Sequence, residues 1–94
     1  MRVKYLDMDS MNVMVEKRIN VDGYDKETIA MTIGANGKNF INWTENTPGI
    51  NFIWHNREKN EIEIKGSEEA EFNNVIKTIK NVLNFNRQII LDRE

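Results

Sequence analysis

The chain has 94 residues, of which 39% are hydrophobic and 30% charged, and its formal net charge at neutral pH is −2. This balance fits one globular domain with a modest core and argues against a disordered chain. No apolar run is long enough to span a membrane, and without cysteine there is no disulfide framework and no cysteine zinc site. We therefore expect an intracellular protein, with the cytoplasm as the default compartment, that makes no membrane contact and needs no cofactor.

The first half of the chain predicts one strand and two short helices. Residues 1–11 have no clear hydrophobic period, and an extra strand, a packed arm and a frayed end are all compatible with them. From 12 to 21 the odd positions are mostly apolar, which indicates a half-buried strand. Asp25 can cap a helix that ends at Ile33, and a second helix is expected over 38–46.

The second half begins with a strand whose two faces differ. After a Thr-Pro-Gly turn, Ile50, Phe52 and Trp54 alternate with more polar positions. This pattern predicts that these three residues face the helices and that Ile53 and His55 face outward.

A third strand is expected over 61–65, followed by a long helix that Ser67 can cap. One apolar stripe predicts that helix, and it consists of Phe72, Val75, Ile76, Ile79, Val82 and Leu83. The tail from 84 to 94 adds further apolar residues. Either the last helix continues and packs them against the sheet edge or the N-terminal arm, or the tail is a self-association surface that makes a homo-oligomer.

A turn bracketed by two glycines separates the first two predicted helices. Gly34 suits the left-handed C-terminal cap of the first helix, and Gly37 lets the second helix begin at once near Lys38. Unpaired N–H groups at that helix start, beside a lysine, offer a small site for a phosphate or another anion. Taken alone, Gly-x-x-Gly more often marks an ordinary corner between two helices.

The surrounding sequence, however, resembles the K-homology (KH) domain, a module that binds single-stranded nucleic acid. In that family an apolar residue precedes Gly-x-x-Gly and a lysine or similar residue follows; two apolar positions three apart, a Thr-Gly turn and an alternating strand come next. The corresponding residues here are Ile33, Gly34 to Gly37, Lys38, Phe40 with Trp43, Thr47-Pro48-Gly49, and Phe52 with Trp54. Two features depart from the family: Pro48 lengthens the turn, and Ala35-Asn36 stands where functional loops often carry Lys or Arg.

The resemblance implies an α+β type I KH fold with the order β-α-α-β-β-α. In this fold three helices cover one face of a three-stranded antiparallel sheet. The KH-like domain would span 12–84, between an N-terminal arm or extra strand at 1–11 and an extension of the last helix at 85–94.

The resemblance also implies non-enzymatic binding of single-stranded RNA or DNA, in a groove between the Gly-x-x-Gly corner and the second strand. Glycines let the backbone approach the phosphates, and apolar side chains form a floor under the bases. The residues expected to bind nucleic acid are Ile29, Ile33, Gly34, Ala35, Asn36, Gly37, Lys38, Phe40, Ile41, Phe52, Trp54, Arg57 and Lys59.

Charge and composition leave one alternative open and disfavour another. The stretch 28–59 carries a net charge of +1 and the rest of the chain −3, which supports only weak, salt-sensitive binding. The alternative is a KH-fold protein-interaction or oligomerisation module with little affinity for nucleic acid. An enzyme is not expected, because there is no cysteine, one histidine and no recognisable acid/base pair. One histidine likewise makes no metal site.

Overall fold

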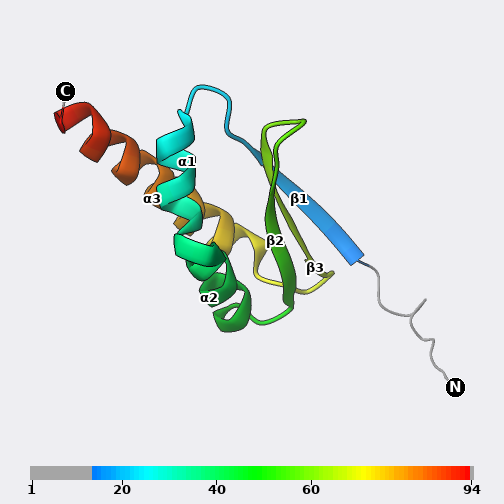
Figure 1. Cartoon of the computed structure of the whole chain (residues 1–94). Coiled ribbons are helices and arrows are strands. Elements are labelled where there is room, and N and C mark those ends of the chain that lie inside the picture. Colours follow the sequence, from blue (N-terminus) through cyan, green and yellow to red (C-terminus); the bar gives the residue numbers. More distant parts are fainter. Residues whose placement is uncertain (1–13, 94) are drawn as a thin grey trace, which may run out of the picture.

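The computed structural model describes residues 14–93, and the arm or extra strand predicted over 1–11 lies outside them. In chain order the elements are β1 (Met14–Asn20), α1 (Lys26–Ile33), the short 3₁₀ turn η2 (Ala35–Gly37), α2 (Lys38–Asn46), β2 (Ile50–Asn56), β3 (Glu61–Ser67) and α3 (Phe72–Arg93). The architecture is α+β, with strands and helices in the predicted order (Figure 1). None of the helices in the described part is both long and apolar enough to cross a bilayer.

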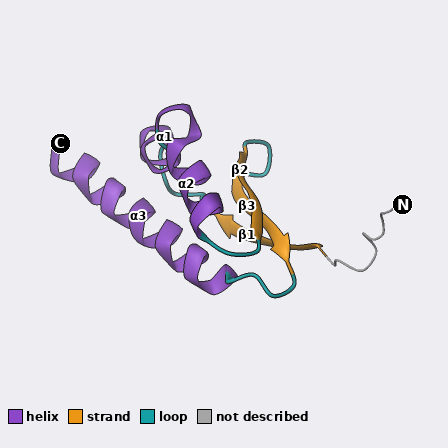
Figure 2. Cartoon of the chain, turned by 90° about the horizontal axis from the view of Figure 1, so that it is seen from below, coloured by secondary structure: helices purple, strands orange, loops and turns teal. Residues whose placement is uncertain are grey.

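The three strands form one antiparallel sheet in which β3 lies between β1 and β2. Figure 2 shows the helices gathered on one side of this sheet. Ile62 and Ile64 of β3 are fully buried and share a hydrophobic core with Ile79 and Leu83 of α3. Burial of each such side chain contributes about 1.5–3 kcal/mol, so the central strand and α3 hold the fold together.

Helix α1 has the predicted bounds, and its two ends show why. Asp25 accepts a hydrogen bond from the Thr28 N–H at 2.8 Å, and this bond is the main cause that lowers the pKa of Asp25. At the other end Gly34 has a φ of 85°, and its N–H donates to the Ala30 carbonyl at 3.0 Å. A side chain is disfavoured at that φ, so the helix ends after Ile33.

Strand β2 differs from the prediction in which side chains face the helices. A bulge between Ile50 and Phe52 places an extra residue on β2, and this shifts the alternation by one position. Ile53 is therefore buried, at 7% exposure, although it was expected to face outward. Phe52 and Trp54 are 45% and 39% exposed, so the prediction that they face the helices is wrong. His55, also expected to face outward, is half-buried.

Helix α3 begins later than the predicted serine cap. Ser67 still belongs to β3, because its N–H donates to the Gly49 carbonyl at 2.9 Å. A turn follows, in which the Ala70 N–H donates to the Ser67 carbonyl at 3.1 Å, and the helix starts at Phe72. Pairing with the chain next to β2 thus outweighs the local capping preference of the serine.

Helix α3 runs to Arg93, and its C-terminal half lies along α1 (Figure 1). The Asn86 amide donates to the Thr32 hydroxyl at 3.1 Å in a buried contact between the two helices. The tail therefore packs on α1 rather than on the sheet edge. Phe85 and Leu91 remain 66% and 54% exposed.

Candidate nucleic-acid interface

The Gly-x-x-Gly loop is a tight corner between α1 and α2. Gly34, Asn36 and Gly37 have φ angles of 85°, 57° and 76°, and the Gly37 N–H donates to the Gly34 carbonyl at 3.0 Å. The Lys38 N–H then bonds the Ala35 carbonyl, so α2 begins directly after the loop, as expected. The side chains between the two glycines are exposed, and a phosphate can approach the corner from solvent.

Gly34 is required for space as well as for its backbone angle. A Cβ at this position would lie 3.0 Å from the side chain of Asn39. Asn39 is held there because its amide donates to the Thr32 carbonyl at 3.1 Å, at the end of α1. Any other residue at Gly34 would meet this side chain in an unfavourable backbone conformation, so the first glycine also keeps the two helices close.

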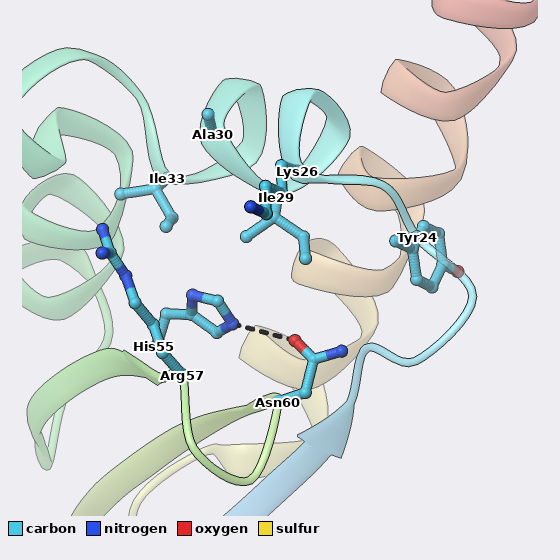
Figure 3. Close-up of a pocket in the computed structure, with 8 residues that line it drawn as sticks. All are labelled: Tyr24, Lys26, Ile29, Ala30, Ile33, His55, Arg57 and Asn60. Atoms are coloured by element: carbon cyan, nitrogen blue, oxygen red, sulfur yellow. Dashed lines mark hydrogen bonds between the residues drawn. The ribbon is translucent and has the colours of Figure 1, made fainter.

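A hollow of about 700 Å³ lies between α1 and the hairpin that joins β2 to β3 (Figure 3). One face of α1 lines it at positions i, i+3, i+4 and i+7, the spacing of residues that share a helix face. Those four residues are Lys26, Ile29, Ala30 and Ile33. The opposite wall is made by His55, Arg57 and Asn60, with Tyr24 at one end.

The charged groups of this hollow are all basic. Lys26 and Arg57 are the charged residues among the eight that line it, and no carboxylate is among the eight. Neither forms an ion pair within residues 14–93. Although the chain has a net charge of −2, this hollow is locally positive, with an apolar floor of Ile29 and Ile33. Such a combination can bind a phosphate and a base together.

A second, smaller hollow of about 290 Å³ lies between α2 and β2. Phe40 and Ile41 of α2 contribute apolar surface to it, and Glu45 supplies one carboxylate. Phe52 faces outward but still borders this hollow, because β2 is an edge strand of the sheet. The first hollow adjoins α1 and the second adjoins α2, the two helices that the glycine loop connects. Both hollows also border β2.

The structure distributes the predicted site residues over several places. Ile29, Ile33 and Arg57 line the first hollow, whereas Phe40, Ile41 and Phe52 line the second. The residues of the glycine corner are Gly34, Ala35, Asn36, Gly37 and Lys38. Trp54 and Lys59 line neither hollow, and Lys59 is exposed in the turn between β2 and β3.

Trp54 instead faces the outward side of the sheet. Its indole N–H donates to Glu63 Oε1 at 2.8 Å, and the Asn56 amide donates to Glu63 Oε2 at 3.0 Å. The bond from Asn56 is the main cause that lowers the pKa of Glu63, and burial opposes it. The ring of Phe52 lies 6.2 Å from that of Trp54, centroid to centroid.

Five lining residues of the first hollow were missed by sequence reasoning: Tyr24, Lys26, Ala30, His55 and Asn60. Helical spacing back from Ile33 and Ile29 would have found Lys26 and Ala30, because they share that helix face. The orientation of His55 was not predicted, because it depends on the bulge in β2 and no pattern in the sequence indicates that bulge.

No family model matches the chain, and no curated protein or solved structure matches it significantly.

Proposed function

We propose that the chain is a type I KH domain that binds a short single-stranded RNA or DNA segment without catalysis. One observation carries the proposal. The Gly-x-x-Gly corner adjoins a hollow with an apolar floor, two basic side chains and no carboxylate. The order of the elements and the one-sided packing of the helices on an antiparallel sheet support the same assignment.

The backbone and the side chains of the site would contact different parts of the ligand. Exposed backbone at the glycine corner would accept phosphates, and Lys38, Lys26 and Arg57 would add positive charge around them. Ile29 and Ile33 would contact the faces of unstacked bases. A single-stranded ligand fits this division, because its bases are free to turn into the hollow.

Fluorescence anisotropy with short single-stranded RNA and DNA pools, at low and moderate salt, tests the proposal. The test variant is the double change Ala35→Asp with Asn36→Asp, which places two negative charges on exposed positions of the loop. We expect it to weaken binding about ten-fold or more at low salt, because the added carboxylates repel the phosphates. The matched control is Asn73→Asp with Asn81→Asp, which adds the same charge at exposed positions of α3.

The control separates a local effect from a general one. If both double variants weaken binding equally, only net charge matters and the loop is not the site. If the native chain binds no pool, the proposal is wrong.

The alternative, a protein-interaction or homo-oligomerisation module, is favoured by the exposed Phe85 and Leu91 of α3. It predicts no binding and a molecular mass that rises with concentration in sedimentation equilibrium.

A further inference from the structure

The side chain of His55 is held in one orientation by a short polar chain. The Asn60 amide nitrogen donates to Asp22 Oδ1 at 2.8 Å, and Asn60 Oδ1 lies 3.2 Å from His55 Nε2. A carboxylate only accepts, so the Asn60 amide group must face Asp22, and its oxygen must face the imidazole. Asn60 Oδ1 then accepts from His55, which places the proton of the neutral ring on Nε2.

This arrangement leaves Nδ1 of the ring as the atom presented to the hollow. Figure 3 shows the Nε2 side of His55 turned to Asn60 and the other nitrogen turned toward Ile29 and Ile33. The apolar floor offers that nitrogen no partner of its own. In the neutral ring Nδ1 is an acceptor, and in the protonated ring it becomes a donor.

The charged and titratable groups around the ring come from every wall. Lys26 of α1, Arg57 after β2 and the Tyr24 phenol line the same hollow, and Asp22 acts through Asn60. Histidine is the side chain whose charge ordinarily changes between pH 5 and 8.

We propose that His55 reads the base held in this hollow and that its protonation reverses the preference. This inference rests on the proposed binding of single-stranded nucleic acid. Neutral His55 accepts through Nδ1 from an exocyclic amino group, the donor that adenine and cytosine carry and uracil lacks. Protonated His55 donates instead to a base carbonyl, and its charge strengthens binding of the phosphates.

Two experiments on the full chain test the proposal. The first is ¹⁵N NMR of the free protein; its single histidine gives one imidazole signal set, and we expect the Nε2–H tautomer above pH 7. The second measures anisotropy with oligo(A), oligo(C) and oligo(U) at pH 8.0 and 5.5. At pH 8.0 we expect oligo(A) and oligo(C) to bind about five-fold more tightly than oligo(U), as one hydrogen bond allows. At pH 5.5 this ratio falls to about one or below.

His55→Asn is the matched variant, because its amide places a polar group near Nδ1 but does not titrate in this range. It should bind all three oligonucleotides with ratios that do not change between the two pH values. The inference is overturned if the free ring carries its proton on Nδ1, if the native ratios are independent of pH, or if His55→Asn keeps the pH-dependent ratios. Absence of binding by the native chain at both pH values overturns the proposed function and this inference with it.

Discussion

The two sides of β2 differ in how their polar groups are satisfied. Toward the helices, His55 and the following Arg57 border a hollow without a carboxylate. On the outward side, Glu63 accepts from both Trp54 and Asn56 and is almost fully buried. Side chains alternate along a strand, so adjacent residues of β2 face different charges. His55 borders the basic hollow, whereas Trp54 and Asn56 contact the carboxylate of Glu63.

The basic residues beside Glu63 and those beside the hollow also differ in their partners. On the outward side Arg18 pairs with Glu16 at 2.7 Å, and Lys65 lies 3.8 Å from the same carboxylate. Lys26 and Arg57 have no such partner within residues 14–93. The proposed binding of an anionic ligand therefore depends on these two cations rather than on the net charge of the chain.

The largest expected effect is the difference in stability between alanine variants on the two faces of β2. Ile53→Ala removes buried side-chain volume from the core and should lower the free energy of unfolding by about 2–4 kcal/mol. Phe52→Ala removes a larger but half-exposed side chain and should cost about 1 kcal/mol or less. Urea denaturation followed by circular dichroism measures both. If Phe52→Ala were the more damaging change, the bulge and the shifted alternation would be wrong.

Strand β2 also shows which features of the fold could not be predicted from the sequence alone. The bounds of α1 and the start of α2 were predictable, because Asp25, Gly34 and Gly37 mark helix ends through local hydrogen bonding and backbone angles. The alternation in β2 was predictable only up to the bulge. A bulge depends on pairing with β3, a contact distant in sequence that no period of β2 alone encodes.

The residues of the candidate site likewise fall into those marked by local sequence and those that depend on distant contacts. Ile29, Ile33 and the glycine corner were found because local spacing and a motif mark them. Asn60 and Asp22 escaped notice, because their role depends on a hydrogen bond between residues far apart in the chain. The resemblance to the KH family assigned Trp54 to the groove, and alternation predicted that it faces the helices, but the bulge places it on the opposite face.

A smaller effect is expected when one basic residue is removed from each side of the sheet. Arg57→Ala should weaken binding of a short single strand about ten-fold at low salt and reduce the slope of log affinity against log salt by about 0.7. Lys65→Ala makes the same change of charge beside Glu16, and it should weaken binding less than about two-fold. Anisotropy across a salt series measures both variants. Equal losses would mean that binding depends on total charge and not on the hollow.

The smallest expected effect concerns the pH dependence of stability on the outward side. Glu63 has a pKa below its ordinary value in the folded chain, since Asn56 and Trp54 donate to the ionised carboxylate. The stabilisation it provides is therefore present above the pKa of an unfolded glutamate and is lost as pH falls through the lower folded pKa. In Glu63→Gln a single amide oxygen replaces two acceptors, so one of the two donors loses its partner.

Urea midpoints at pH 7 and pH 3 measure this contribution. The native chain should exceed Glu63→Gln in stability at pH 7, and the difference should shrink at pH 3, where protonation removes the native advantage. Glu68→Gln, at an exposed position of the turn before α3, should show the same small difference at both pH values. Oligonucleotide binding by Glu63→Gln should stay unchanged, because Glu63 lines neither hollow. A loss of binding in this variant would move the site to the outward face, where the exposed rings of Phe52 and Trp54 would then be the stacking surface.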